Sequence, residues 1–235
     1  MKPTIVITGA SQGIGAAIAR EFAREVRGAR LALIARNARN LDRVAAACVK
    51  LGAKARAFVC DVTDPAAVAT TSAAVEKAFG VADVLVNNAG AFAPRPFLEE
   101  TLEGFDRMLT VNLRSAFIVS QAFVPAMARR GRGHVFMMSS IAGRDAYPDG
   151  TAYCAAKFGL TGLGAVMRRE LRERGVRVTT LYPGATWTPS WKESGVHPDR
   201  LMTARAVARA VVDSWKLGPE AVIEDIVLRP PLGDV

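Results

Sequence analysis

The stretch from Thr4 to Gly15 reads TIVITGASQGIG, so a short apolar run rich in β-branched side chains passes directly into three closely spaced glycines. The residues that follow repeat apolar side chains at helical spacing, at Ile18, Ala19, Phe22 and Val26. A strand, a glycine turn and a helix in this order are typical of an α/β unit that binds phosphate groups. This stretch therefore indicates both the fold class and a ligand site.

The three glycines have the spacing G-x-x-x-G-x-G, and each has a physical use. Gly9 permits a tight turn, Gly13 lets the backbone approach a pyrophosphate, and Gly15 lets the helix pack against the strand. The free N–H groups and the positive dipole at the start of a helix attract phosphate. The alternative is a turn with a structural role only, which its place at the first strand-to-helix junction disfavours. The residues predicted to bind the cofactor here are Gly9, Ser11, Gln12, Gly13, Ile14 and Gly15.

Strand-length apolar runs recur along the chain, and helical patterns separate several of them. The predicted strands are Thr4–Thr8, Arg30–Ala35, Ala55–Cys60, Asp83–Val86, His134–Ser139, Arg177–Tyr182 and Ile223–Leu228. Because most of these runs are apolar without alternation, they indicate parallel strands that are buried on both faces. We predict an α/β fold, in which residues 1–235 form a single Rossmann-type doubly wound domain. Its seven-stranded parallel sheet carries helices on both faces, and residues from about 185 to 203 form a substrate loop.

Composition narrows the class of protein further. The chain has 235 residues, a formal net charge of +9 and three widely spaced cysteines, which suggest neither a disulfide framework nor a metal site. It contains no apolar run of about 18 residues and no signal-peptide pattern at its start, so we expect a cytoplasmic protein without a membrane partner. The basic residues are dispersed, which argues against a nucleic-acid partner. The positive charge either attracts an anionic ligand or simply decorates helix surfaces.

Arg36 follows the second predicted strand, at the place where NAD-binding sites have a carboxylate that accepts from the ribose hydroxyls. A guanidinium pairs with a 2′-phosphate, whereas a carboxylate repels it. We therefore predict that NADP(H) rather than NAD(H) is the cofactor. The alternative is that Arg36 is an ordinary solvated residue. Asp61 and Val62, which follow the third predicted strand, are expected to border the adenine.

In its order of motifs the sequence resembles the short-chain dehydrogenases/reductases, and the match covers nearly the whole chain. The matching motifs are the glycine turn, Asn87-Asn88-Ala89-Gly90, Asn112, Ser140, Tyr153, Lys157 and Pro183-Gly184. A glycine turn or a Y-x-x-x-K pattern alone is common, but the complete ordered set is specific. The resemblance implies an oxidoreductase that moves a hydride between a nicotinamide cofactor and an alcohol or carbonyl group.

Tyr153 and Lys157 are four residues apart on a predicted helix, so their side chains share one helix face. A free tyrosine has a pKa of about 10, and a nearby positive charge lowers the pKa of a phenol. We therefore expect the Lys157 ammonium to make the Tyr153 hydroxyl a usable acid and base. By resemblance, Lys157 also binds the nicotinamide ribose.

The resemblance assigns roles to further residues. Ser140 lies thirteen positions before Tyr153, the family's usual separation, and is preferred to Ser139 as the donor to the substrate oxygen. Asn112 is implied to hold, through its backbone carbonyl, a water that connects Lys157 to solvent. Thr188 is implied to bind the nicotinamide amide. The remaining residues implied to contact the cofactor are Asn88, Ala89, Gly90, Pro183 and Gly184.

The substrate is much less determined by the sequence. The residues expected to line its pocket are Phe92, Ala142, Tyr147, Trp187 and Trp191, of which the two tryptophans are equally suited to packing a lid. Arg95 and Arg144 either meet a carboxylate or are rim charges. The aromatic side chains suggest a partly apolar carbonyl compound. By resemblance, the long helix candidates Arg107–Arg130 and Tyr153–Arg174 form the contact face of a homodimer or homotetramer.

We therefore predict an NADPH-dependent oxidoreductase that reduces a ketone or aldehyde to an alcohol, or catalyses the reverse reaction. The end of the chain is similar to that of 3-hydroxy acid dehydrogenases and sepiapterin-reductase-like members. It lacks the glycine-rich ending of 3-oxoacyl-carrier-protein reductases, which remain the alternative enzyme. The alternative of another class is a protein that senses NADP(H) without catalysis, and a basic nucleic-acid binder is a third hypothesis. No metal site is expected.

Overall fold

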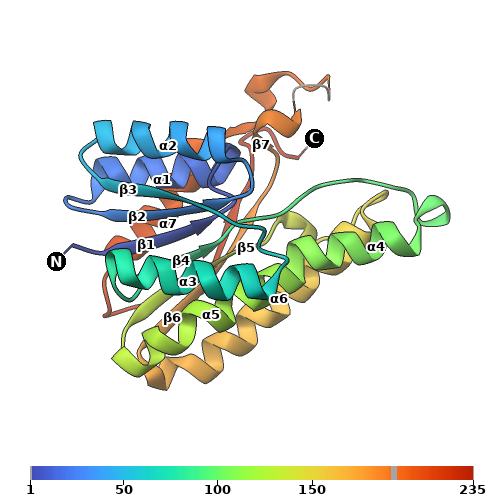
Figure 1. Cartoon of the computed structure of the whole chain (residues 1–235). Helices are drawn as coiled ribbons and strands as arrows, with labels where there is room; N and C mark the ends of the chain where they lie inside the picture. Colours follow the sequence, from blue (N-terminus) through green and yellow to red (C-terminus); the bar gives the residue numbers. More distant parts are fainter. Residues whose placement is uncertain (1, 192–194, 235) are drawn as a thin grey trace.

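Seven strands form one central sheet in the order β3-β2-β1-β4-β5-β6-β9 (Figure 1). The structure is a computed structural model that describes residues 2–191 and 195–234. The strands of this sheet are β1 (Thr4–Thr8), β2 (Arg30–Ala35), β3 (Lys54–Val59), β4 (Val84–Asn87), β5 (Gly133–Met138), β6 (Val176–Pro183) and β9 (Asp225–Leu228). Every neighbouring pair is parallel. The prediction of a seven-stranded parallel α/β sheet is confirmed.

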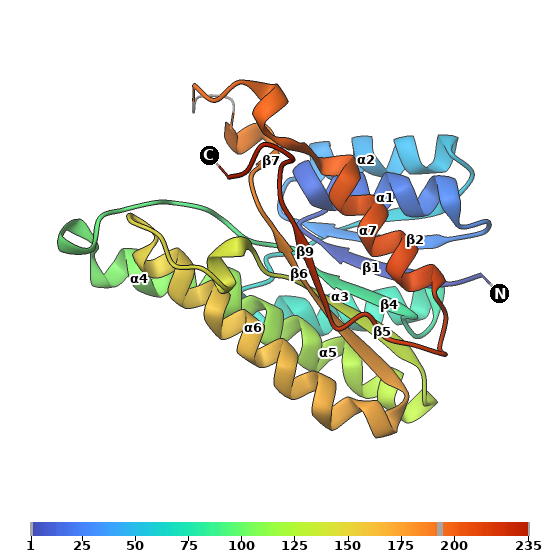
Figure 2. The same cartoon turned by 180° about the vertical axis from the view of Figure 1, so that it is seen from behind.

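Helices cover both faces of the sheet (Figures 1 and 2). They are α1 (Gly13–Glu25), α2 (Ala38–Lys50), α3 (Pro65–Phe79), α4 (Leu102–Leu109), α5 (Ser115–Arg130), α6 (Thr151–Leu171) and α7 (Ala204–Lys216). One apolar core joins the sheet to α1, α2 and α7, and a second joins it to α3, α5 and α6. Because both faces are covered, β1 and β4 are buried along their whole lengths.

The order of the strands reverses between β1 and β4, because β2 and β3 extend the sheet to one side of β1 and the later strands extend it to the other. In open parallel sheets a ligand crevice forms beyond the carboxyl ends of the strands at such a reversal. The loops after β1 and β4 meet there. The glycine turn and the Asn88–Gly90 segment therefore lie at the expected edge.

The segment predicted as one helix from Arg107 to Arg130 is interrupted. A π-helical turn, η2 (Thr110–Arg114), joins α4 to α5 and contains Asn112 at its centre. Ser115, the first residue of α5, donates its hydroxyl hydrogen to the Val111 carbonyl in this turn at 2.6 Å. Spacing alone did not reveal this turn, since a π turn inserts one residue into an otherwise regular pattern.

The long connection after β6 begins and ends in a second, small sheet. The strands β7 (Thr186–Trp187) and β8 (Met202–Thr203) pair in parallel, so the predicted loop from about 185 to 203 is closed at its base. Between them the described part includes two short 3₁₀ turns, η5 (Pro189–Trp191) and η6 (Pro198–Arg200). The C-terminal segment ends beside this connection (Figure 1). Both therefore border the carboxyl edge of the sheet.

Candidate active site

Three glycines allow the turn after β1 to lie directly against the chain that follows β4. Gly9 and Gly13 have φ angles of +65° and +56°, which side chains rarely permit. A methyl group on Gly15 would lie 2.4 Å from the carbonyl oxygen of Gly9 and 2.6 Å from Nδ2 of Asn88. A methyl group on Gly9 would lie 2.9 Å from the Cα atom of Ala89. The close contact therefore requires glycine.

Two side chains fasten this turn to the end of β4. The Thr8 hydroxyl accepts from the backbone N–H groups of Asn88 and Ala89 at 2.9 and 3.0 Å. The Asn88 amide donates to the carbonyl of Thr8 at 2.9 Å. Thr8 was not among the predicted site residues, although a polar side chain next to Gly9 at the end of a buried strand is the signal that marks it. Asn87 is buried behind them and donates to Ser120 at 2.9 Å.

The start of α1 is suited to an anion. Gln12 occupies the position before the helix without a capping hydrogen bond from its side chain, and the first turn contains no acidic residue. By contrast, α2, α3, α4 and α7 each begin with a side-chain cap. The first N–H groups of α1, like those of α5 and α6, therefore lack the side-chain partner that these four helices have. Together with the open glycine turn, they fit the pyrophosphate of a dinucleotide.

Arg36 lies where β2 ends, and its side chain is 79% exposed. One guanidinium nitrogen is 3.8 Å from a carboxylate oxygen of Asp61, which follows β3. The pKa of Asp61 is lowered, first by a hydrogen bond from the backbone N–H of Thr63, then by one from the Thr63 hydroxyl. The next residue, Val62, is buried. Arg36 and Asp61 thus lie side by side after β2 and β3, and most of the arginine side chain is accessible to solvent.

Tyr153 is the third residue of α6, and its hydroxyl lies within hydrogen-bonding reach of Ser140. Its ring packs edge-to-face on Phe92, with 4.9 Å between the ring centroids. Burial raises the pKa of Tyr153 to about 12, and the hydrogen bond with Ser140 opposes this rise. The lowered pKa expected from the sequence is therefore not found in the chain itself, because desolvation of the phenolate outweighs the hydrogen bond with Ser140.

Lys157 lies one helical turn after Tyr153 and is buried, with 5% of its surface exposed. Its ammonium donates to the carbonyl of Met138 at 2.9 Å and lies 5.5 Å from the centroid of the Tyr153 ring. Burial lowers the pKa of Lys157 to about 8. A methyl group on Gly90 would lie 3.8 Å from this nitrogen. Lys157 therefore faces the segment after β4 as well as the tyrosine.

The two serines after β5 point to different partners. The Ser139 hydroxyl donates to the backbone carbonyl of Lys157 at 3.2 Å and lies 3.1 Å from the Thr161 hydroxyl. The Ser140 hydroxyl accepts from the N–H of Ala142 at 3.2 Å and lies 3.5 Å from the carbonyl oxygen of Pro183. Ser139 is thus engaged with α6, whereas Ser140 is beside Tyr153 at the end of β6.

Asn112 acts through its side chain in this structure. Its amide donates to the carbonyl of Ala91 at 3.0 Å and to that of Met108 at 3.1 Å, and its Oδ1 accepts from the N–H of Ala91 at 3.1 Å. A methyl group on Gly90 would lie 2.7 Å from the same Oδ1. Asn112 therefore holds the segment after β4 against the π turn. The role implied for its backbone carbonyl stays a prediction.

The remaining predicted cofactor-binding residues, Pro183, Gly184 and Thr188, lie at the end of β6 and just after it. Pro183 pairs with Leu228 of β9, and the N–H of Gly184 donates to the carbonyl of Leu228 at 2.8 Å. Thr188 lies beside the glycine turn, since a methyl group on Gly13 would be 3.3 Å from its Cγ2 atom. The connection after β6 therefore reaches across the crevice to α1.

The residues predicted to line the substrate pocket differ in how exposed they are. Phe92, Tyr147 and Trp187 are half-exposed at this edge, with 50%, 40% and 37% of their surfaces accessible. Trp191 ends η5 and directly precedes residues 192–194, which lie outside the described residues. Ala142 is completely buried, so its methyl group does not line an open surface here. The aromatic side chains therefore provide the accessible apolar surface.

Residues 2–191 and 195–234 contain neither a membrane-spanning helix nor a metal-binding cluster. No helix there is long and apolar enough to span a membrane. No group of three or more histidine, cysteine, aspartate or glutamate side chains there is placed to hold a metal ion.

Comparison with known proteins adds independent information. Residues 3–198 match the sequence profile of the family described as short chain dehydrogenase. Sepiapterin reductase of Chlorobaculum tepidum is 36% identical, over 100% of this chain and 99% of that protein. D-threitol dehydrogenase of Mycolicibacterium smegmatis is 39% identical, over 78% of this chain and 70% of that protein.

Two solved structures with a similar fold are also oxidoreductases. An alcohol dehydrogenase from the archaeon Thermococcus sibiricus, complexed with 5-hydroxy-NADP, superimposes with a TM-score of 0.91 and 30% identity, and covers 99% of this chain and 98% of that one. A metagenomic short-chain oxidoreductase in complex with NADP superimposes with a TM-score of 0.84 and 34% identity, and covers 97% of each chain.

Proposed function

Because the chain belongs to the short chain dehydrogenase family, and is thus an oxidoreductase of alcohol and carbonyl groups, we propose that it is an NADP(H)-dependent enzyme that interconverts a ketone or aldehyde and its alcohol. The observation that supports this most strongly is one cluster at the carboxyl edge of the sheet. There the hydroxyl of Tyr153 meets Ser140, Lys157 lies below the tyrosine ring, and the glycine turn is adjacent.

Each residue of the cluster has a chemical task. In the reducing direction Tyr153 donates its phenol proton to the substrate oxygen, and general acid catalysis of this kind contributes about 10²–10⁴-fold. Ser140 donates a second hydrogen bond to the same oxygen and orients it. The buried Lys157 ammonium supports the negative charge left on the phenol oxygen. A bound nicotinamide supplies or accepts the hydride.

The chain's own residues fit the cofactor as follows. The uncapped start of α1 and the turn from Gly9 to Gly15 would hold the pyrophosphate, with Asp61 and Val62 at the adenine. Asn88, Ala89 and Gly90 would border the middle of the cofactor, and Pro183, Gly184 and Thr188 its nicotinamide end. Two solved relatives that contain NADP or a derivative support the choice of phosphorylated cofactor.

Replacing Arg36 with glutamate is expected to reverse the cofactor preference. Its exposed guanidinium is the positive group at the end of β2, and hydrogen bonds to a charged partner contribute about 1.5–3 kcal/mol. We therefore expect kcat/KM with NADPH to fall about 10–100-fold relative to kcat/KM with NADH. Parallel assays with the two cofactors and one ketone give this ratio directly.

Arg43→Glu is the matched control, because it makes the same charge change at an exposed position of α2. That variant should keep the ratio of the wild type. An Arg36→Glu variant that also keeps it would show that this arginine does not select the cofactor.

The rate should depend on pH in opposite ways for the two directions. Tyr153, with its pKa raised to about 12, stays protonated through the neutral range and so remains ready to donate. Lys157, with its pKa lowered to about 8, is charged below that pH and loses its proton above it. We expect kcat for reduction to be level below about pH 8 and to fall above it. For alcohol oxidation kcat should rise with pH, because the phenol must first lose its proton. A reduction rate that increases above pH 8 would contradict these assignments.

We also propose a homodimer or homotetramer that uses α5 and α6. Phe117 on α5 is 49% exposed, and Phe158 and Val166 on α6 are 45% and 53% exposed. Large apolar side chains on two adjacent helices provide a surface that a second copy would bury. The substrate is proposed to be a partly apolar carbonyl compound, held by Phe92, Tyr147 and the tryptophans of the loop after β6.

A further inference from the structure

The chain after β9 folds back onto the carboxyl edge of the sheet, as Figure 2 shows beside β7. A turn reverses its direction, since the N–H of Gly233 donates to the carbonyl of Pro230 at 2.9 Å. We call residues Arg229–Asp234 the C-terminal tail. A methyl group on Gly184 would lie 2.9 Å from a carboxylate oxygen of Asp234 and 3.4 Å from Cδ of Pro230. The tail is therefore packed directly against the residue that follows β6.

This position is close to the candidate catalytic group. The Ser140 hydroxyl lies 3.5 Å from the carbonyl oxygen of Pro183, and Gly184 is the next residue along the chain. Asp234 and Ser140 thus approach two consecutive residues at the end of β6, Gly184 and Pro183. The tail borders the same edge of the sheet as the loop that joins Ser140 to Tyr153.

Arg229 connects the tail to that loop. One guanidinium nitrogen pairs with the carboxylate of Asp145 at 2.5 Å, and another pairs with the carboxylate of Asp234. Asp145 lies between Ser140 and Tyr153. The preceding residue, Arg144, places its guanidinium 5.2 Å from the centroid of the Tyr182 ring on β6. Two adjacent residues of the loop therefore contact β6 and the tail that follows β9.

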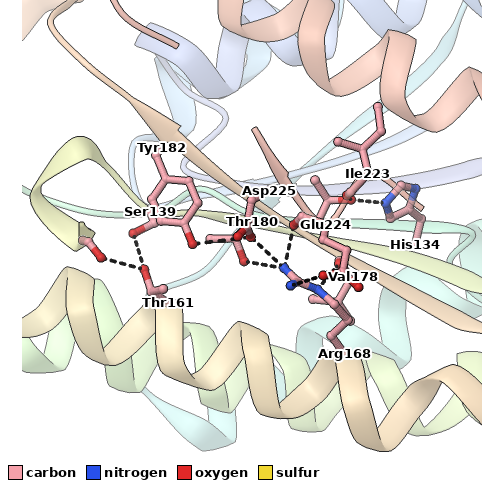
Figure 3. Close-up of polar contacts among 12 residues, drawn as sticks. His134, Ser139, Thr161, Arg168, Val178, Thr180, Tyr182, Ile223, Glu224 and Asp225 are labelled. Carbon is pink, nitrogen blue, oxygen red and sulfur yellow. Dashed lines mark hydrogen bonds and ion pairs between the residues drawn. The ribbon is translucent and has the colours of Figure 1, made fainter. Parts of the chain in front are cut away.

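The beginning of β9 is anchored separately (Figure 3). Arg168 of α6 donates to the carbonyl of Glu224 at 2.5 Å, to the carboxylate of Asp225 at 2.9 Å and to the carbonyl of Val178 at 3.0 Å. The side chain of Arg168 is only 16% exposed, although its partners Glu224 and Asp225 are at the surface. The start of β9 is thus fixed to the helix that carries Tyr153. Arg229 performs the corresponding task at the other end of the strand.

On the basis of the proposed function, we propose that Arg229 is a positioning residue for substrate binding. Through Asp145 and Asp234 it holds the C-terminal tail and the Ser140–Tyr153 loop together as one wall on the substrate side of the crevice. A guanidinium presents several donors in a fixed fork, so it binds two carboxylates at once, whereas an ammonium is a single point charge. A carbonyl compound large enough to reach beyond Ser140 and Tyr153 rests on this wall, and a small one does not.

Because the three side chains of this ion-pair cluster are exposed, an effect on substrate binding can be told apart from an effect on stability. Arg229, Asp145 and Asp234 are 41%, 60% and 39% exposed. Ion pairs this accessible contribute little to the free energy of unfolding and are weakened by salt. Loss of Arg229 should therefore loosen the wall while the melting temperature stays nearly the same.

The test compares Arg229→Ala with the wild type on two diketones that share the reacting group, butane-2,3-dione and 1-phenylpropane-1,2-dione, with NADPH as the cofactor. We expect KM for the phenyl compound to rise about fivefold. KM for butanedione, kcat for butanedione and the affinity for NADPH should not change. Hydrogen exchange should become faster in residues 141–150 and 229–234. Raising the salt concentration should increase KM for the phenyl compound in the wild type and have no such effect in the variant.

Two further variants test whether the effect on KM is specific to the Arg229 guanidinium. Arg229→Lys should restore part of the KM effect, because it keeps the charge but not the fork. Lys216→Ala is the control, since it removes an exposed ion pair of 2.7 Å with Glu25, between α7 and α1. It should leave both KM values unchanged.

The inference is overturned if Arg229→Ala changes the KM of both diketones equally, or changes neither. A large fall in its melting temperature would likewise overturn it, by showing a structural role. If the wild type turns over no carbonyl compound, the proposed function fails. In that case the hydrogen-exchange comparison still decides whether Arg229 holds the tail and the loop together.

Discussion

Replacing Tyr153 with phenylalanine is expected to lower kcat by about 10²–10⁴-fold while the affinity for NADPH stays unchanged. The substitution removes only the hydroxyl that meets Ser140. The ring, its contact of 4.9 Å between centroids with Phe92, and the position of the Lys157 ammonium are all retained. The loss should appear equally in kcat and kcat/KM, because the proton transfer occurs in the transition state.

Steady-state oxidation of NADPH with a ketone gives the rate, and fluorescence titration gives the cofactor affinity. Tyr182→Phe is the matched control, since it removes the tyrosine hydroxyl that bonds Asp225 at 3.4 Å and leaves Ser140 untouched. Full activity in Tyr153→Phe would refute the assigned acid. Tight NADPH binding by a wild type that turns over no carbonyl compound in a broad panel would instead favour a nucleotide-sensing protein.

The strands were the part of the fold that local sequence determined best. β1 and β2 have the predicted bounds, Thr4–Thr8 and Arg30–Ala35, because the interior of each is an unbroken apolar run. β3, β4 and β5 differ from prediction by one residue at their ends, where pairing with a neighbour decides the boundary. Motif order then predicted the residues of the candidate site, several of which follow a strand whose carboxyl end lies at one edge, whereas Asn112, Tyr153 and Lys157 lie in helical segments.

Features that depend on distant contacts could not be predicted in this way. The pairing of Thr186–Trp187 with Met202–Thr203 joins segments about fifteen residues apart that have no strand pattern of their own. The Arg229–Asp145 ion pair connects positions 84 residues apart. The sequence contains many oppositely charged residues that could form ion pairs. Arg229 is brought close to Asp145 only when β9 pairs with β6.

The direction in which the pKa of Tyr153 shifts could not be predicted from the sequence either, for a different reason. The spacing of Tyr153 and Lys157 correctly indicates a shared helix face, and the two side chains do lie together. Spacing says nothing of how much water surrounds them. Burial raises the pKa of the phenol to about 12 and lowers the pKa of the ammonium to about 8, so each resists its charged form. We infer that the tyrosine is organised as a proton donor at neutral pH.

The second large effect is expected from Gly15→Ala, which adds a single methyl group at the start of α1. That methyl would lie 2.4 Å from the Gly9 carbonyl oxygen and 2.6 Å from the Asn88 amide, so the glycine turn or the end of β4 must move. Overpacking of this kind costs about 1–3 kcal/mol. We expect the melting temperature to fall by about 2–4 °C for each kcal/mol. The affinity for NADPH should fall at least about tenfold, because the displaced turn is the proposed phosphate cradle.

Thermal unfolding and NADPH titration measure the two effects, and Gly162→Ala provides the control. A methyl group on Gly162, within α6, would meet no atom of the described chain within 4 Å, so NADPH affinity should stay that of the wild type. A Gly15→Ala protein with wild-type affinity would show that the cofactor does not depend on this turn. Weaker NADPH binding in Gly15→Ala at an unchanged melting temperature would instead place the whole cost of the methyl group in the phosphate site. That result would make close approach of the backbone to the phosphates, rather than helix packing, the reason that glycine occupies this position.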